Sequence, residues 1–153
     1  MTTTIRQQNE RFLQQERKEI ALSMTPAQIA EEIRQTLKTE FPSWKFSVRT
    51  STFAGGFHVQ VYLLKGPRDV FAVDTITTST GAWAINGHME INQYHPEFMD
   101  EYLTPEGVWL MKHVIRITNR RNWDESDYKT DYFDVHYYTT VSIGRWDRHY
   151  TIK

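Results

Sequence analysis

The chain has 153 residues, enough for one domain with an ordinary buried core and no need for disulfide or metal cross-links. Aromatic residues make up 14% of it, which excludes disorder for most of the chain and favours aromatic packing on a sheet. It contains no cysteine, so disulfides, thiolate catalysis and cysteine-ligated zinc are excluded.

The balance of charge argues against two classes of protein. A formal net charge of −1 is neither that of a general polyanion-binding domain, which is usually strongly basic, nor that of an acidic DNA mimic. No apolar run approaches the ~18 residues of a membrane span, and the N-terminus lacks the apolar core of a signal peptide. We therefore expect a soluble cytoplasmic protein with no membrane partner.

Residues 1–23 are predicted to form a helical arm. Gln, Glu, Arg and Lys dominate it, a composition that favours helix. Its apolar residues are sparse and partly spaced by seven, as in Ile5 to Phe12 and Leu13 to Ile20. Such an arm either docks loosely and frays, as termini commonly do, or packs on a partner or on a second copy of the chain, which would give a homodimer.

The next segment carries the signals of a helix that begins at Thr25. Thr25 can cap the helix, Pro26 suits its first turn, and Gln28 completes a capping box. An apolar residue then recurs at every fourth position, which predicts a core-facing stripe. Its members are Ile29, Ile33, Leu37 and Phe41. Pro42 ends the helix.

Two alternating runs joined by a glycine pair predict an antiparallel hairpin. Apolar and polar residues alternate from Trp44 to Arg49 and again from His58 to Leu63, which is the period of a half-buried strand. Gly55 and Gly56 supply the backbone freedom that a bulged connection requires.

Residues 68–79 are compatible with two structures. Val70, Val73 and Ile76 lie three apart, which suits a helix. The same stretch is rich in β-branched residues, which suits a strand. The residues alone leave helix and strand open.

Three further elements complete the chain. The segment from Trp83 to Tyr94 alternates and predicts a third strand, bent at Gly87. Thr104-Pro105 repeats the Thr-Pro helix start, and the apolar spacing after it predicts a helix to about Asn122. The segment from Tyr132 to Ile143 alternates and predicts the last and longest strand.

These elements define an α+β fold. Helices that interrupt a hairpin-rich sheet predict an antiparallel sheet of about four strands, with about two or three helices packed on one face. Residues 24–153 would form this single α+β domain, and residues 1–23 the N-terminal helical arm. The other face of the sheet would be polar and aromatic. It would carry His58, Gln60, Tyr62, His88, Glu90, Asn92, His136 and Tyr138.

Two pairs of potential metal ligands stand on predicted strands. His88 and Glu90 lie two residues apart, so both side chains point to one face, and Asp134 and His136 repeat the arrangement. If those strands were neighbours, the four side chains would meet and could hold a divalent cation. The same spacing is ordinary for polar pairs on a solvated sheet face. We prefer that interpretation, so no metal or other cofactor is predicted.

Arginines and aromatic residues are interleaved in the last third of the chain. Trp123, Trp146 and Tyr150 could stack on bases while the arginines contact phosphates. The arginines are Arg116, Arg120, Arg121, Arg145 and Arg148. Acidic neighbours such as Asp124 and Asp147 could neutralise them, so nucleic-acid binding is the second hypothesis rather than the first.

Known catalytic motifs are missing from the sequence. It has no Gly-x-Ser-x-Gly nucleophile turn, no phosphate-binding loop and no dinucleotide fingerprint. We therefore expect a protein that is not an enzyme.

The predicted hairpin also carries a resemblance to a known family. The motif is the run from Lys45 to Gly56, KFSVRTSTFAGG, followed by an alternating strand and Gly66-Pro67. It resembles the opening of the large polyvalent-protein-associated domain 29. The segment from Asn86 to Ile91 matches the next landmark, a glycine before a Met-Ile strand. Further similar runs begin at Leu103, Asn122, Asp131 and Ile143, so the resemblance covers about residues 25–153.

The resemblance implies context more than chemistry. Members look helical after the Gly-Pro pair, which favours helix for residues 68–79. They occur in large proteins of phages and conjugative elements, thought to enter a recipient cell with DNA and act against host defences. No catalytic residue is carried over. Leu64-Lys65-Gly66-Pro67 replaces the Trp-Thr-Asp-Gly-Pro turn of many members, so that turn's carboxylate has no counterpart here.

Together these observations predict a small non-enzymatic protein of a phage or other mobile element. It would bind a host protein complex in the host cytoplasm, as an anti-defence inhibitor of the anti-CRISPR or anti-restriction type. A near-neutral surface rich in aromatic residues fits a protein-binding module. The candidate anchors are Tyr62, Trp83, Tyr94, Trp123 and Trp146. The alternative is a nucleic-acid-binding accessory protein that uses the arginines above.

Overall fold

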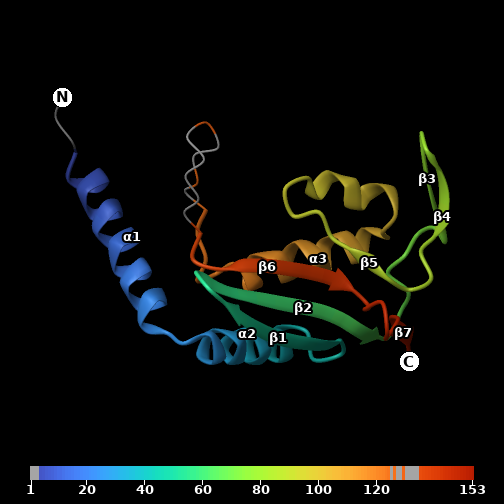
Figure 1. Cartoon of the computed structure of the whole chain (residues 1–153), viewed down its shortest axis with the longest axis horizontal. Coiled ribbons are helices and arrows are strands. Elements are labelled where there is room, and N and C mark those ends of the chain that lie inside the picture. Colours follow the sequence, from blue (N-terminus) through green and yellow to red (C-terminus); the bar gives the residue numbers. More distant parts are fainter. Residues whose placement is uncertain (1–3, 125, 127–128, 130–134) are drawn as a thin grey trace.

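The computed structural model describes residues 4–124, 126, 129 and 135–153, and its fold is α+β, as the sequence predicts. A mixed sheet lies beside two helices and a small hairpin stands at one end. Helix α1 (Ile5–Ser23) projects from the other end (Figure 1). No helix within these ranges is both long and apolar enough to cross a membrane.

The first two helices begin with the same capping box. At α1, the Thr4 hydroxyl accepts a hydrogen bond from the Gln7 backbone N–H, and the Gln7 side chain accepts one from the Thr4 N–H. Thr25 and Gln28 repeat these contacts at α2 (Pro26–Glu40). The two helices differ in burial, because α2 buries the predicted apolar stripe whereas α1 buries Ala21.

The main sheet has five strands, in the order β1–β2–β6–β5, with β7 also paired to β2. The strands are β1 (Lys45–Phe53), β2 (Gly56–Gly66), β5 (Met89–Glu90), β6 (Tyr138–Ile143) and β7 (Thr151–Ile152). The predicted antiparallel hairpin is confirmed as β1 and β2, and β5 is antiparallel to β6. However, β6 and β7 run parallel to β2, so the sheet is mixed rather than antiparallel throughout.

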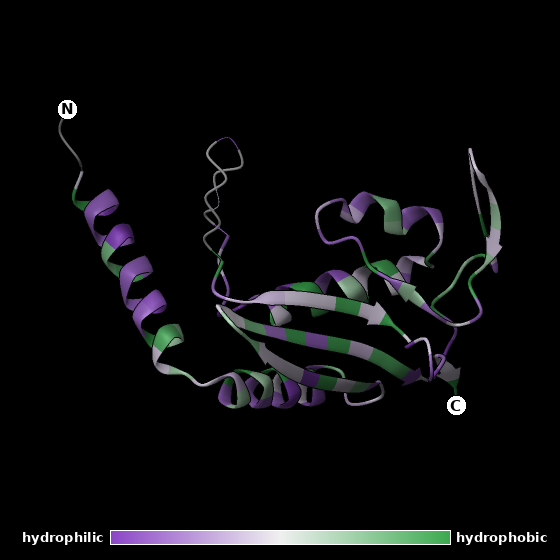
Figure 2. Ribbon diagram, in the orientation of Figure 1, coloured by the Kyte–Doolittle hydropathy of each residue, from purple (hydrophilic) through white to green (hydrophobic). Residues whose placement is uncertain are grey.

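Helices α2 and α3 (Pro105–Thr118) contact each other and cover one face of this sheet. Val59, Val61 and Leu63 of β2 point to that face and are fully buried. Their neighbours Val48 on β1 and Val141 on β6 extend the core to both sides. Hydrophobic and hydrophilic residues alternate along β2 in Figure 2, which gives the sheet one apolar and one polar face.

Residues 68–79 do not form a helix, so the interpretation that the family resemblance favoured is wrong. Thr75–Thr78 form strand β3, which pairs antiparallel with β4 (Gly81–Ala84). A helix would bury Val70 and Val73 together, but Val70 is 0% exposed and Val73 is 40% exposed. The β-branched composition predicts the observed strand correctly, whereas the spacing of three apolar residues does not.

The predicted third strand, from Trp83 to Tyr94, is split in two. Asn86 and Gly87 have positive φ angles of 53° and 74° and turn the chain between β4 and β5. Strand β4 pairs with β3, whereas β5 joins the main sheet beside β6. The glycine predicted to bend one strand therefore separates two sheets.

The C-terminal elements are shorter than predicted. Helix α3 ends at Thr118, before Asn122, and a 3-10 helix η1 (Pro96–Glu101) precedes it. Strand β6 covers only the second half of the predicted last strand. Residues 132–134 of that prediction lie outside the described residues.

Candidate functional site

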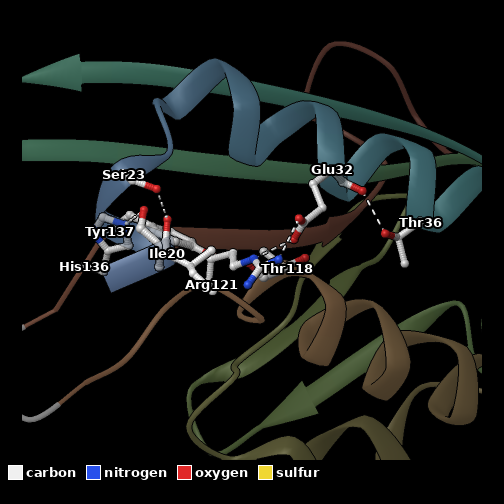
Figure 3. A network of polar contacts seen from close by, with 9 residues as sticks. Ile20, Ser23, Glu32, Thr36, Thr118, Arg121, His136 and Tyr137 are labelled. Atoms are coloured by element: carbon white, nitrogen blue, oxygen red, sulfur yellow. Dashed lines mark hydrogen bonds and ion pairs between the residues drawn. The ribbon is translucent and has the colours of Figure 1, made fainter. Parts of the chain in front are cut away.

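A network of polar contacts joins α2, α3 and the end of α1 (Figure 3). The guanidinium of Arg121, just beyond α3, donates to both carboxylate oxygens of Glu32 on α2, with Nε–Oε1 at 2.9 Å and Nη2–Oε2 at 3.0 Å. The two side chains are 23% and 26% exposed, and the hydrogen bond to Glu32 raises the pKa of Arg121. Arg121, predicted to contact phosphate, is therefore occupied in holding two helices together.

Tyr137, which directly precedes β6, belongs to the same network. Its hydroxyl donates to the carbonyl of Thr118 at the end of α3, with an O–O distance of 2.7 Å, and its ring stacks on Phe57. Burial raises the pKa of Tyr137 above its ordinary value. This residue attaches the end of α3 to the start of β6.

His136 connects α1 to the domain. Its Nε2 lies 3.2 Å from the carbonyl oxygen of Ala21, and its ring stacks on Trp123 with centroids 4.7 Å apart and planes 11° apart. The ammonium of Lys18 lies 5.1 Å from the centroid of the same Trp123 ring. Trp123, a predicted partner anchor, is thus half-buried against the base of α1.

A basic cleft of about 560 Å³ lies between α1 and the end of α3. It is lined by Gln14, Arg17, Lys18, Ala21, Arg120, Arg121, Asn122 and Trp123. Arg17 and Arg120 are exposed and form no ion pair within the described ranges. Arg17 and Lys18 are not among the residues predicted from the sequence, although their spacing from Gln14 and Ala21 puts all four on one helix face.

Four large apolar side chains of α1 lie on the side of the helix away from this cleft. At roughly 100° per residue, the cleft residues of α1 centre on one side and these four residues centre about 140° from it. Ile5, Phe12, Leu13 and Ile20 are 77%, 70%, 48% and 45% exposed. Helix α1 thus turns a polar face to its own domain and an apolar stripe to solvent, the reverse of an ordinary packed helix.

The five candidate arginines do not form one surface. The group at the end of α3, beside the start of β6, comprises Arg116, Arg120 and Arg121. Arg145 and Arg148 bond to each other through their backbones in the turn after β6. Strand β6 spans about 17 Å between the two groups. Arg145 also donates to Asp147 at 3.0 Å, and its guanidinium carbon lies 5.6 Å from the centroid of the Tyr62 ring.

The five aromatic anchor candidates are likewise dispersed over the molecule. Trp83 on β4, Tyr94 before η1 and Trp146 after β6 are 50%, 78% and 80% exposed. Tyr62 and Trp123 are half-buried, under Arg145 and against His136 respectively. A partner that touched all five would have to wrap around the domain.

The four candidate metal ligands are not brought together. His88 and Glu90 lie at β5, next to the end of β6, whereas His136 precedes the start of β6 and stacks on Trp123. Asp134 lies outside the described residues. Within the part of the chain that the structure describes, no three His, Asp or Glu side chains form a group that could hold a metal ion.

The fold and its exposed surfaces define a small α+β domain with a projecting N-terminal helix. This chain belongs to the family of the large polyvalent protein associated domain 29, whose family model matches residues 24–122. The resemblance carried by the hairpin is confirmed. The match begins at the start of α2 and ends after α3, so α1, β6 and β7 lie outside it. No match is found among curated proteins or among solved structures.

Proposed function

We propose that this chain is a non-enzymatic protein of a phage or other mobile element that binds a host protein complex as an anti-defence inhibitor. Its membership of a family associated with large polyvalent proteins supports this setting. The observation that carries the proposal is the outward apolar stripe of α1, formed by Ile5, Phe12, Leu13 and Ile20. A hydrophobic groove on the partner would receive this stripe.

The stripe is suited to helix-in-groove binding. Burying one Leu, Ile or Phe side chain contributes about 1.5–3 kcal/mol, so a few such contacts support specific association. The capping box at Thr4 orders the first turn before the partner arrives, which lowers the conformational entropy lost on binding. Polar residues on the rest of α1 keep the free helix hydrated.

A charge placed in the stripe tests the proposal. Tagged protein is expressed in a bacterial host that carries CRISPR and restriction systems, recovered from a nuclease-treated lysate, and analysed by mass spectrometry. We expect a stoichiometric partner from a defence complex, and at least about tenfold lower recovery with Phe12→Glu, which corresponds to about 1.4 kcal/mol. Gln14→Glu adds the same charge on the cleft side of α1, away from Phe12, and should retain the partner.

The possible outcomes test α1 as the binding element separately from the proposed function. Equal recovery by wild type and Phe12→Glu would contradict α1 as the binding element. Recovery of no host protein at all, with the chain folded and soluble, would contradict the proposed function itself.

A second copy of the chain is the competing occupant of the stripe. Two α1 helices could pack their apolar faces together in a homodimer. Sedimentation velocity distinguishes the two cases, and we expect a monomer. A dimer that Phe12→Glu dissociates would assign the stripe to self-association instead.

The basic cleft favours a second candidate function, that of a nucleic-acid-binding accessory protein. Arg17, Lys18 and Arg120 line the cleft and could contact phosphates. Because bound cations release counterions from the nucleic acid, the affinity should fall steeply with salt. Arg120→Glu should weaken binding of labelled DNA and RNA at least about tenfold. Unchanged binding would remove the cleft from this function.

A further inference from the structure

The face of the main sheet opposite the helices is open. Alternation along β2 points His58, Gln60 and Tyr62 to this face, and all three are half-buried. The register of β1 and β6 extends it to both sides. The added residues are Ser47, Arg49 and Ser51 on β1, and Tyr138 and Thr140 on β6, whereas Ser142, the next residue of this row, is buried. Helices α2 and α3 pack on the other face (Figure 1). The apolar side chains of the strands are buried on that face.

One end of this open face carries a group of cations. Lys45 alternates with the core residue Phe46 on β1 and so points to the open face. A register shift between these two residues makes Lys65, rather than Leu64, the partner of Lys45 on β2, and Lys65 in turn pairs with β7. Arg148 and Lys153 lie on either side of β7. The charge of Lys153, followed by burial and the charges of Lys45 and Arg148, lowers the pKa of Lys65, so Lys65 lies within electrostatic reach of the other three cations.

These four cations are available to a ligand. None of them forms an ion pair within the residues described. Asp147, next to Arg148 in the sequence, is already bonded to Arg145, and Glu90 on β5 pairs with Ser142 of β6 rather than with the strands that carry Lys45 and Lys65. Four like charges gathered without counter-ions raise the local potential and attract a polyanion, even though the net charge of the whole chain is −1.

Aromatic rings stand on the same face at both of its ends. Tyr62 lies near the cations on β2, with the guanidinium carbon of Arg145 5.6 Å from its ring centroid. At the other end, the rings of Phe53 on β1 and Tyr138 on β6 lie 5.8 Å apart, and each residue is 47% exposed. Between Lys65 and the row of Tyr138, β2 spans about 23 Å.

We propose that this open face binds single-stranded nucleic acid. Phosphates lie along the cations at one end, and unpaired bases stack on the exposed ring pair of Phe53 and Tyr138 at the other. A duplex fits less well, because its bases are stacked inside and cannot reach rings on a sheet. The proposal rests on the nucleic-acid-binding candidate function and places it on a surface other than the basic cleft.

Charge reversal at the cations tests this site. Fluorescence anisotropy measures the binding of the full chain to a labelled oligodeoxythymidine of about 12 nucleotides, at about 50 and 150 mM salt. Lys65→Glu with Lys153→Glu should weaken binding at least about tenfold and reduce the slope of log affinity against log salt by about 0.7 for each phosphate that the variant no longer neutralises. The substitutions also relieve repulsion, so the fold should persist.

Two matched variants complete the design. Lys38→Glu with Lys112→Glu reverses two exposed lysines on the helical side of the molecule and should leave the affinity unchanged. Phe53→Ala with Tyr138→Ala removes the exposed ring pair and should weaken binding at least about fivefold, because stacking contributes to the affinity for single strands.

Each outcome decides between the proposals. Unchanged binding by Lys65→Glu with Lys153→Glu would overturn the sheet site. If Arg17→Glu with Arg120→Glu abolished binding instead, the basic cleft would be the site and the candidate function would stand. No binding by wild type at low salt would overturn both. Equal competition by polyglutamate, with no effect of the aromatic substitutions, would identify an acidic polypeptide as the ligand and overturn the assignment to nucleic acid.

Discussion

Gly144 ends β6 at a point where a side chain would meet backbone. Its φ is +67°, and a Cβ atom there would contact the carbonyl oxygen of Gly87 and lie 2.8 Å from the nitrogen of Tyr150. Those two groups form the hydrogen bond that joins the turn before β5 to the segment before β7. We expect Gly144→Ala to lower the free energy of unfolding by about 3 kcal/mol or more, as measured by urea unfolding.

Gly81→Ala is the matched control for this substitution. Gly81 also has a positive φ, +139°, but a Cβ atom there would have no neighbour within 4 Å. The loss should be about 1 kcal/mol, from backbone strain alone. Equal losses in the two variants would contradict the backbone contact as the cause.

Three buried tyrosines should make the stability depend on alkaline pH. Burial raises the pKa of Tyr102 and Tyr150 to about 12, and it raises the pKa of Tyr137 as well. Tyrosine in the unfolded chain titrates near pH ~10, so the unfolded state loses its protons first. The stabilising contribution is fully present below pH ~10 and is lost as the pH rises through the folded-state pKa, by up to about 1.4 kcal/mol per pH unit for each tyrosine.

Tyr137→Phe separates one tyrosine from this set. Urea unfolding at several pH values from about 9 to 11.5 should show a shallower decline for this variant, because phenylalanine cannot ionise. At neutral pH the variant should lose about 1 kcal/mol, since the carbonyl of Thr118 loses its hydrogen-bond donor. Parallel pH profiles would count against a raised pKa at this position.

Residue chemistry was predictable from the sequence, but the pairing of residues was not. The sequence groups Arg121 with neighbouring arginines, yet its partner Glu32 lies 89 positions away, and no local spacing reveals that ion pair. The sequence does not single out Arg17, because its place in the cleft depends on α1 facing Arg120. In the sequence, Lys45 and Lys65 are ordinary polar positions of a hairpin. In the structure, β7 places Arg148 and Lys153 near them.

At the scale of elements, the same capping box should matter at one helix and not at the other. Thr25→Ala removes the acceptor of the Gln28 N–H and should lower the free energy of unfolding by about 1 kcal/mol, because α2 packs in the core. Thr4→Ala removes the matching acceptor at α1, which buries only Ala21 of its residues. The free energy of global unfolding of the Thr4→Ala variant should be unchanged, while the helical circular dichroism signal of this variant decreases slightly.

Urea unfolding followed by tryptophan fluorescence, with helicity from circular dichroism, makes this comparison. Equal losses of global stability in Thr4→Ala and Thr25→Ala would mean that α1 unfolds together with the domain. A loss in Thr4→Ala alone would reverse the roles given to the two helices.

Elements with signals inside one or two turns were the predictable ones. The helix starts at Thr25 and Thr104 each combine a hydroxyl cap with a following proline, and both begin helices in the structure. The helix favoured at residues 68–79 failed because the spacing of three and the β-branched content conflict, and pairing with β4 resolves the conflict. Strands β3 and β4 have four residues each, which is too short to show a clear alternating pattern in the sequence.

At the scale of the whole molecule, the parallel pairing of β2 and β6 lay beyond sequence patterns. Alternation is the same in parallel and antiparallel strands, so it cannot give direction. His58 and Thr140, whose side chains bond across the pair at 2.7 Å, are 82 positions apart. The connection between β2 and β6 contains β3, β4, β5, η1 and α3, and its length permits the crossover that parallel strands need.

Removing residues 1–23 should separate the functions assigned to α1 from the stability of the rest. The family match begins at residue 24, and α1 contributes Ala21 to the buried residues, so residues 24–153 should fold alone. The Tm should fall by no more than about 4 °C, because Trp123 loses the ammonium of Lys18 and His136 loses the carbonyl of Ala21. Partner recovery from the lysate should be abolished, because the apolar stripe is gone, while binding of the oligonucleotide to the open sheet face should remain.

A shortened chain that fails to fold would make α1 an integral part of the domain. One that keeps the protein partner but loses the oligonucleotide would exchange the roles of α1 and the sheet.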